Sequence, residues 1–391
     1  MEQNNIIWPL INENISFEDK KLLSEFILSA NRFTNGPKVA EFEKKWSKWL
    51  GVKYSVMVNS GAMANYLSIA ILKEIKGFEG EIIVPPIGWV SDVASVLNHG
   101  FTPVFVDVDL ETLSINTETI KEAISDQTKG IVLVHCLGFN ALTDSMIDFV
   151  REKNIFLIED CCEAHGAKHG RKKVGVFGDI SCFSFYYGHH MTTIEGGMVC
   201  TNDENLYELA KLFRSHGMTR EANSNIQKLY IDNHPELNPL FTFAVPGYNI
   251  RSTEINAVLG INQIKRLDEN IKARKNNLDI WLNNLDSKLF HTDLNSLGNS
   301  NFALPLILVK KSKTLFNNVQ NLLKEEKIEF RVGTAGGGNQ ALQPYLKNYE
   351  FKISKKLEIA NHVHHFGLYI GNHTELNENQ IKILCTQLNE C

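Results

Sequence analysis

The stretch Ser181-Cys-Phe-Ser-Phe-Tyr-Tyr-Gly-His-His-Met-Thr-Thr-Ile-Glu-Gly-Gly-Met198 decides how this chain builds its pocket. It opens with small and aromatic residues typical of a strand end and has a polar centre. It then turns at Gly196-Gly197 into a second apolar strand, Met198 to Cys200. Because polar residues between two buried strands shape a pocket rather than a core, we expect the reactive side chain in the middle, at His189.

The centre of this stretch offers histidine and no amine. No lysine occurs between Lys173 and Lys211, whereas His189 and His190 lie side by side. A histidine pair more often fills a loop than performs chemistry, but an unperturbed imidazole with a pKa of about 6.5 suits proton transfer in both directions. We predict that His189 is an acid–base group, and leave open whether His190 shares that role.

Composition bounds the function. The 391 residues are 43% hydrophobic, and 40 Lys+Arg against 45 Asp+Glu give a formal charge of -5, so neither a nucleic-acid nor a membrane partner is expected. The N-terminus lacks a leader pattern, and no apolar run approaches the ~18 residues of a membrane span. Seven scattered cysteines without a CxxC pair argue against a disulfide framework. We expect reduced thiols and a cytoplasmic protein.

Short apolar runs alternate with helical stretches over the first half of the chain. A capping box at Ser16 opens the first helix, and apolar spacing predicts a second amphipathic helix that carries Val39, Phe42, Trp46 and Leu50. The expected strands are Tyr54 to Val58, Glu81 to Val84, Pro103 to Val108, Gly130 to His135 and Ile155 to Glu159. This alternation predicts an α/β fold with a mostly parallel sheet covered by helices, and ligands at the carboxyl ends of its strands.

The second half predicts a smaller domain. Residues 219–245 read as an irregular excursion, and a long helical region follows Arg251 with Ser252 as its N-cap. Fewer strands follow. We expect an N-terminal segment 1–37, a large cofactor-binding domain 38–261 and a small C-terminal α/β domain 262–391.

The loops at the expected strand ends carry the unusual residues. Ser60-Gly61-Ala62 lies between a strand and a helix, where free N–H groups favour a phosphate. Trp89 could stack on a flat ring, although packing is the commoner role of such a residue. Asp160 could bind a pyridine nitrogen or cap a helix, and Ser184 offers a hydroxyl to a phosphate.

Longer segments resemble one family. They are Arg32-Phe-Thr-Asn-Gly36, Val56-Met-Val-Asn-Ser-Gly61, Asp160-Cys-Cys-Glu-Ala-His-Gly166, His216-Gly-Met-Thr-Arg220 and Pro246-Gly-Tyr-Asn-Ile-Arg251. Over roughly residues 7–385 the chain resembles the pyridoxal-phosphate (PLP) enzymes that aminate or deoxygenate nucleotide-linked sugars. That resemblance implies the aspartate-aminotransferase-like fold, PLP fold type I. Histidine at the position of the Schiff-base lysine resembles the 3-dehydratases of this family, nearest to those that act on GDP-4-keto-6-deoxymannose.

The resemblance implies roles for individual residues. Ser60, Gly61, Ala62 and Ser184 would bind the cofactor phosphate, Trp89 would stack, Asp160 would hold the ring nitrogen and Glu163 would lie beside the ring. Asn249 would reach the phosphate from a partner subunit, which implies a homodimer. Expected substrate contacts are His216, Arg220, Arg251, Gly337 and Asn339, and the glycine-rich loop Thr334 to Asn339 leaves room for a heptose.

The implied activity is a C3 dehydration driven by L-glutamate, which would convert PLP to pyridoxamine phosphate (PMP). A 3,6-dideoxy-4-keto sugar and ammonia would result, for surface polysaccharide biosynthesis. The alternatives are a 4-aminotransferase and a non-catalytic cofactor- or sugar-binding homologue. A related CDP-sugar enzyme needs an iron–sulfur cluster held partly by a Cys-x-Cys pair, which is missing here. His362, His364 and His365 lie in a helical stretch, and we expect no metal site.

Overall fold

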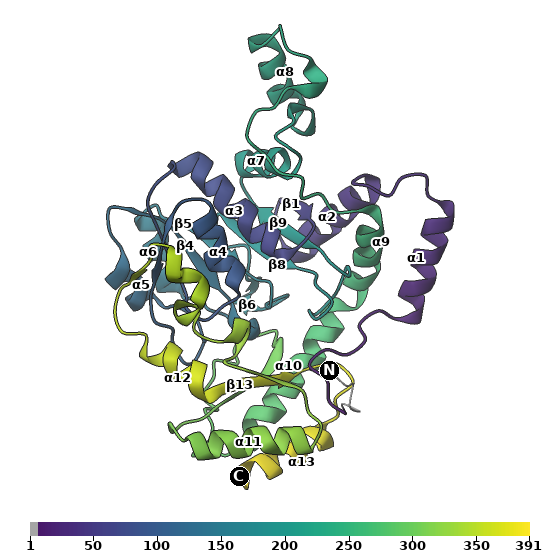
Figure 1. Cartoon of the computed structure of the whole chain (residues 1–391). Helices are drawn as coiled ribbons and strands as arrows, with labels where there is room; N and C mark the ends of the chain where they lie inside the picture. Colours follow the sequence, from purple (N-terminus) through teal and green to yellow (C-terminus); the bar gives the residue numbers. More distant parts are fainter. Residues whose placement is uncertain (1–6) are drawn as a thin grey trace.

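The computed structural model describes residues 7–391 and is built on one large sheet (Figure 1). Its eight strands follow the order β1-β9-β8-β5-β4-β2-β3-β12. The strands are β1 (Tyr54–Val58), β2 (Glu81–Val84), β3 (Thr102–Phe105), β4 (Thr128–Val134), β5 (Phe156–Asp160), β8 (Ile180–Ser184), β9 (Gly197–Thr201) and β12 (Lys352–Ile353). Strand β9 pairs antiparallel with both β1 and β8, and every other pairing is parallel. The predicted mostly parallel α/β sheet is confirmed.

Helices cover this sheet, and the first two begin where the sequence predicts. The Ser16 side chain accepts from the backbone of Asp19, whose carboxylate accepts from Ser16 in return, so a capping box opens α1. The helices are α1 (Phe17–Ser29), α2 (Pro37–Leu50), α3 (Gly61–Lys76), α4 (Val90–Asn98), α5 (Thr117–Ala123), α6 (Asp144–Glu152), α7 (Glu204–Arg214), α8 (Ser224–Asn233), α9 (Glu254–Gln263), α10 (Leu267–Asn284), α11 (Lys313–Glu325), α12 (Glu358–Phe366) and α13 (Glu378–Asn389).

An aromatic cluster fixes the quoted stretch in the core. Trp46 of α2 packs edge-on against Phe183 and Phe185, at ring-centroid distances of 5.1 and 4.8 Å. Phe42, one turn earlier, lies 5.2 Å from Phe185. All four rings are fully buried. The burial of Phe183 and Phe185 against α2 therefore fixes one end of the stretch in the core. The polar centre of the stretch forms a loop.

A second, three-stranded antiparallel sheet lies towards the C-terminal end of the chain. Its order is β10 (Ala303–Ile307), β13 (Gly367–Gly371) and β11 (Phe330–Val332), with α10, α11 and α13 beside it (Figure 1). The predicted boundary at residue 262 falls at the end of α9 and stays a prediction. The N-cap of α9 is Thr253, which accepts from Asn256, so the prediction of Ser252 was wrong by one position. The hydroxyl of Ser252 is instead buried.

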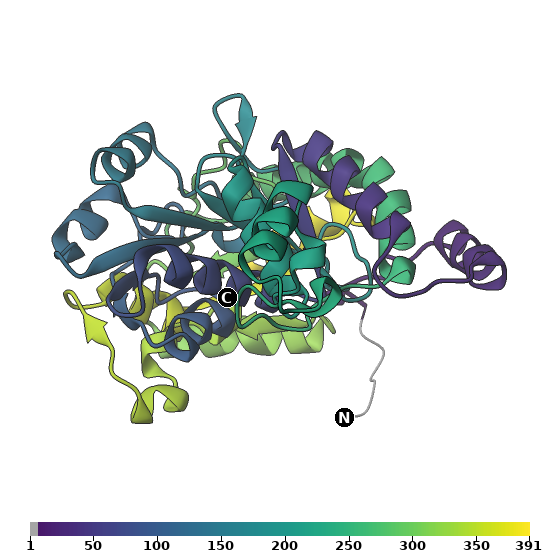
Figure 2. The ribbon, with the colours of Figure 1, turned by 90° about the horizontal axis from the view of Figure 1, so that it is seen from above.

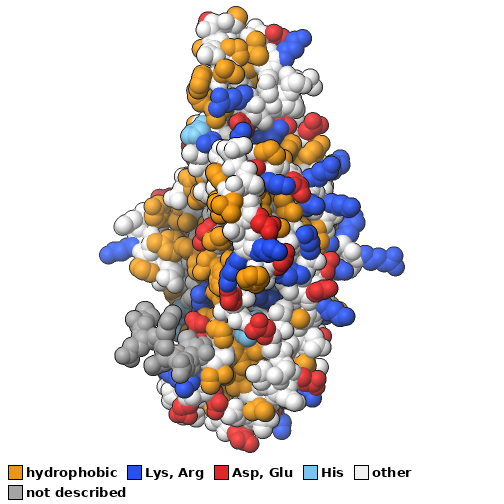
Figure 3. Space-filling view, turned by 90° about the vertical axis from the view of Figure 1, so that its right-hand side faces the viewer, with side chains coloured by type: hydrophobic (Ala, Val, Ile, Leu, Met, Phe, Trp, Pro, Cys, Tyr) orange, Lys and Arg blue, Asp and Glu red, His pale blue; other side chains and the backbone are white. Residues whose placement is uncertain are grey.

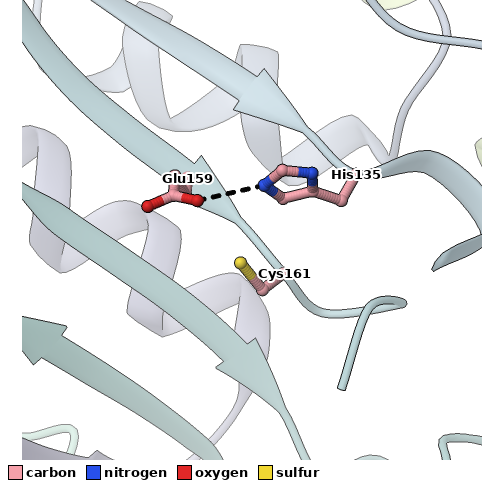
Figure 4. A group of neighbouring side chains, drawn as sticks. All are labelled: His135, Glu159 and Cys161. Carbon is pink, nitrogen blue, oxygen red and sulfur yellow. Dashed lines mark hydrogen bonds and ion pairs between the residues drawn. The ribbon is translucent and has the colours of Figure 1, made fainter. Parts of the chain in front are cut away.

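A buried carboxylate organises the loop that leads into β8. Glu159 accepts from the backbone N–H groups of Gly175, Phe177 and Gly178, at 2.8, 2.8 and 2.6 Å, and its other contact is Nε2 of His135 at 3.2 Å (Figure 4). Cys161 lies beside this pair. Because the protein's own donors occupy both Glu159 oxygens, this group reads as a structural tie rather than a metal site.

Residues 219–245 project from the body as an arm around α8 (Figures 1 and 2). The predicted irregular excursion is thus partly helical. Hydrophobic side chains gather on this arm (Figure 3). The exposed ones are Leu229, Ile231, Leu237, Leu240, Phe241 and Phe243. Within residues 7–391, none of the helices combines the length and the apolar character needed to cross a membrane.

Candidate active site

A pocket of about 400 Å³ opens at the carboxyl ends of the parallel strands, within the size range of small-molecule sites. The loops after β1, β2, β5 and β8 form one wall. The opposite wall comes from the second sheet: Ala303 of β10, Arg331 of β11 and Tyr369 of β13. Predicted residues that line this pocket are Ser60, Gly61, Ala62, Trp89, Asp160, Glu163, Ser184 and His189.

A cradle for a small anion lies at the N-terminus of α3. The Ser60 hydroxyl caps the helix by accepting from Met63, while the N–H groups of Gly61 and Ala62 begin the helix and have no partner within it. The backbone approaches Ser184 closely: a Cβ on Gly61 would lie 2.4 Å from the Ser184 Cβ. A Cβ on Gly197 would likewise lie 2.2 Å from the Ser60 carbonyl oxygen. The Ser184 hydroxyl therefore lies close to the free N–H groups at the helix N-terminus, an arrangement that suits a small anion.

Gly61→Ala is expected to weaken PLP binding, because the new methyl group and the Ser184 side chain cannot share this space. Displacing the Ser184 hydroxyl from a bound phosphate removes a hydrogen bond to a charged group worth about 1.5–3 kcal/mol, which is roughly a 10- to 150-fold loss of affinity. Titration of the apoprotein with PLP, followed by protein fluorescence, measures the loss. Glu74→Ala, at an exposed position near the other end of α3, is the control. Unchanged affinity in Gly61→Ala would show that the phosphate binds elsewhere.

Two carboxylates end β5 and its loop. Asp160, which is 5% exposed, accepts from the N–H of Cys162 at 2.8 Å and from the amide of Asn65 at 2.6 Å. Glu163 accepts from Leu137 at 2.8 Å, and burial raises its pKa to about 7. An aspartate at this depth in the pocket floor fits the protonated nitrogen of a pyridine ring.

His189 lies in the loop after β8 and faces the pocket. Its backbone is fixed at both ends: its N–H donates to Tyr186 at 3.0 Å, and its carbonyl accepts from Asn14 at 3.0 Å. The ring packs at 5.3 Å from Phe302, and Nδ1 has no hydrogen-bond partner among the described residues. A positioned imidazole with a free nitrogen can accept or return a proton.

The expectation of a near-normal pKa for His189 was wrong. Burial lowers the pKa of His189 to about 4, and the Arg274 guanidinium lowers it further while Asp160 opposes both. The imidazole of the unloaded protein is therefore neutral at neutral pH, which is the state in which it can accept a proton.

His190 points elsewhere. Its Nε2 lies 2.8 Å from the Ser300 carbonyl oxygen, to which it donates, and the side chain is fully buried away from the pocket. His165 lies 5.3 Å from His190 and 5.9 Å from His189, and burial lowers its pKa well below the usual value. Of the three neighbouring histidines, only His189 reaches the pocket.

Several pocket residues carried no signal in the sequence. Arg331 and Tyr369 come from the second sheet, Phe302 immediately precedes its strand β10, and all three line the pocket. Arg331 is largely exposed, donates to the Tyr369 hydroxyl at 3.3 Å, and gives the pocket a cation. Trp89 is 51% exposed at the pocket edge, a position suited to a stacking ring rather than to the core.

The other predicted residues lie outside this pocket. Arg220 and Arg251 border a separate hollow with Arg32, whereas Asn249 and His216 are exposed on neighbouring segments that pair through Ser215. Gly337 is exposed on its loop. Asn339 is buried, donates to Asn361 of α12 at 2.9 Å and accepts from the N–H of Ala341 at 2.9 Å, so its side chain is satisfied by the protein itself.

Comparisons with known proteins agree with this geometry. The model of the DegT/DnrJ/EryC1/StrS aminotransferase family matches residues 15–389. A GDP-4-keto-6-deoxy-D-mannose 3-dehydratase from Yersinia pseudotuberculosis is 34% identical over 98% of both chains. A GDP-perosamine synthase from Escherichia coli O157:H7 is 28% identical over 98% of both chains. A crystal structure of GDP-4-keto-6-deoxymannose-3-dehydratase with a trapped PLP-glutamate geminal diamine matches with a TM-score of 0.89 and 32% identity, over 97% of this chain and all of that one.

Proposed function

The chain belongs to the DegT/DnrJ/EryC1/StrS aminotransferase family, and from that premise we propose that it is a PLP-dependent sugar 3-dehydratase. Its substrate would be a GDP-linked 4-keto-6-deoxy sugar, either GDP-4-keto-6-deoxymannose or a heptose analogue. One observation carries the proposal: His189 faces the pocket, and no lysine is among the described residues that line it. An aminotransferase of this family needs that amine to hold PLP covalently and regenerate it.

Each pocket residue would have a separate role in such a reaction. Bound PLP or PMP supplies an electron sink in its protonated pyridine ring. The N-terminus of α3 and the Ser184 hydroxyl would hold the phosphate, Asp160 the ring nitrogen, and Trp89 one face of the ring. His189 would take a proton from the cofactor methylene and return it to the C3 hydroxyl as that group leaves. Its burial keeps water from competing for this proton.

L-Glutamate is the amino donor in this proposal, and ammonia the released nitrogen product. Arg331 is a cation among the described residues that line the pocket and would attract the carboxylate of the donor. The described cysteines are all unpaired, which suits the cytoplasm, where we propose that the enzyme acts.

We also propose a homodimer with shared sites. Asn249 is exposed and does not reach the pocket of its own chain, so the phosphate contact that the family resemblance implies would have to come from a partner. The apolar arm beside this segment offers a surface for such a partner (Figure 3).

Sedimentation equilibrium is expected to give about twice the chain mass of 44.2 kDa. In a dimer with shared sites, Asn249→Ala is expected to lower PLP affinity without changing the sedimented mass. A fully active monomer at dilute concentration would contradict this assembly.

The substrate is tested by incubating the protein with PLP, glutamate and a panel of 4-keto-6-deoxy nucleotide sugars. One part of the panel keeps the sugar the same and changes the nucleotide. The other part keeps the nucleotide the same and compares a hexose with a heptose. We expect the product mass of the accepted GDP-linked sugar to show loss of one oxygen. No deoxygenation of any member would overturn the proposed function. A 4-amino sugar would then indicate an aminotransferase, and unreacted sugars would indicate a non-catalytic, cofactor-holding homologue.

A further inference from the structure

Two carboxyl groups in the pocket floor share a single side-chain amide. Nδ2 of Asn65, on α3, donates to Oδ2 of Asp160 at 2.6 Å and to Oδ1 of Asp92, on α4, at 2.8 Å. The hydroxyl of Ser91 is a weaker third acceptor at 3.3 Å. Because both carboxylate oxygens contact the same nitrogen, Asp92 and Asp160 are held close together by three different elements.

Among residues 7–391, no lysine or arginine forms an ion pair with either carboxyl group. Asp92 is 2% exposed and Asp160 5%. Asp160 gains a further N–H donor from Cys162, whereas Oδ2 of Asp92 is buried in the pocket wall without a partner among the described residues. Two adjacent carboxylates in a medium of low dielectric do not both ionise, and the one with fewer donors keeps the proton.

The surroundings of Asp92 favour its neutral form. Burial raises the pKa of Asp92 well above its usual value, and the charges of Asp160 and Glu163 add to this effect. The backbone near Trp89 and the amide of Asn65, which donates to Oδ1 of Asp92, oppose it. Tyr345, on which the charge of Asp92 acts, is a neutral phenol whose pKa is raised to about 12 mainly by burial. None of the described groups that act on Asp92 is a cation.

We propose that Asp92 and Asp160 hold one proton between them, carried by Asp92, so that Asp160 is the single anion available to the pyridine nitrogen of the cofactor. Asp92 is then a positioning residue that acts through Asn65 and Asp160. The protonation of Asp92 is a property of the protein without cofactor. Only its consequence for the pyridine ring of PLP rests on the proposed function. No redox step or co-reactant is involved.

Infrared difference spectroscopy of the apoprotein tests where the proton lies. With aspartate carboxyls labelled by carbon-13, the wild type at pH 8 is expected to show a protonated-acid carbonyl band that is missing from Asp92→Asn. If the asparagine variant does not fold, Asp92→Ser takes its place. A band that persists unchanged in the variant, or a wild type without any such band, would overturn the proposal.

A stability measurement supports the same test. A carboxyl group whose pKa is raised by folding destabilises the protein above its unfolded value of about 3.9. Wild type is therefore expected to lose stability relative to Asp92→Asn as the pH rises from about 4, with a constant difference below that pH. A pH-independent difference would count against a proton on Asp92.

The absorbance of bound PLP, measured as a function of pH, reports the protonation of the pyridine nitrogen and so tests the consequence for the cofactor. A neutral amide replaces a neutral acid in Asp92→Asn, so the charge beside Asp160 does not change and the titration of the bound ring is expected to stay unshifted. Ser91→Ala, which removes a neutral acceptor from the same amide, is the matched control. A titration moved by about one unit or more in Asp92→Asn alone would mean that Asp92 is a second anion and would overturn the proposal. Failure of the wild type to bind PLP would instead contradict the proposed function.

Discussion

The His189→Asn variant is expected to bind PLP with near-native affinity but to lose roughly 10²–10⁴-fold of its turnover, the usual cost of removing a positioned general base. Asparagine keeps approximate size and polarity, and the backbone contacts to Tyr186 and Asn14 do not depend on the side chain. The site should therefore keep its shape while proton transfer fails. Rapid-mixing measurement of the sugar reaction, with PLP affinity determined in parallel, separates the two effects.

His190→Asn is the matched control for this variant. It removes a neighbouring imidazole of the same stretch that donates to Ser300 and does not reach the pocket. Turnover per folded molecule should stay within about threefold of wild type, the effect of a hydrogen bond outside the chemistry. If the His190 variant lost the C3 step and the His189 variant kept it, the base assignment would be wrong.

Asp160→Asn is expected to give the second large effect. The charge-assisted hydrogen bond that a carboxylate makes to a pyridinium nitrogen is worth about 1.5–3 kcal/mol, which corresponds to roughly a 10- to 150-fold loss of PLP affinity. Turnover should fall further, because an unprotonated ring is a poorer electron sink. The amide can still accept from Cys162, so the local loop should survive.

Equilibrium titration with PLP measures this loss, and the absorbance of the bound cofactor reports its ring protonation. Glu163→Gln is the comparison, because Glu163 lines the same pocket but accepts from the Leu137 backbone. We expect a smaller loss of affinity there. Equal losses in the two variants would show that Asp160 has no special contact with the ring nitrogen.

The position of the pocket could be predicted because the carboxyl ends of parallel strands lie at the same edge of a sheet. Strands β1 and β2 have the predicted bounds, and β5 ends at Asp160, so Ser60, Trp89 and Asp160 meet as expected. The predicted fold, including its mostly parallel sheet, follows from this local pattern.

Other features depend on three-dimensional packing and left no trace in the sequence. Asn65 and Asp92 face one another only through the rotation of α3 and α4 about their axes. Arg331 and Phe302 join the pocket through the docking of a second sheet, formed far along the chain. The lowered pKa of His189 arises from burial, which a residue's neighbours in sequence do not reveal.

The fate of the donor nitrogen tests the central claim most directly. The protein is supplied with PLP, nitrogen-15-labelled glutamate and the accepted 4-keto-6-deoxy nucleotide sugar, and the label is followed by mass spectrometry and by ammonia assay. If the protein is a dehydratase that uses His189 in place of a Schiff-base lysine, the label is expected to appear as ammonia. The amount of ammonia should equal the amount of sugar that has lost its C3 oxygen. Label retained in a 4-amino sugar with the C3 hydroxyl intact would contradict this account and identify an aminotransferase.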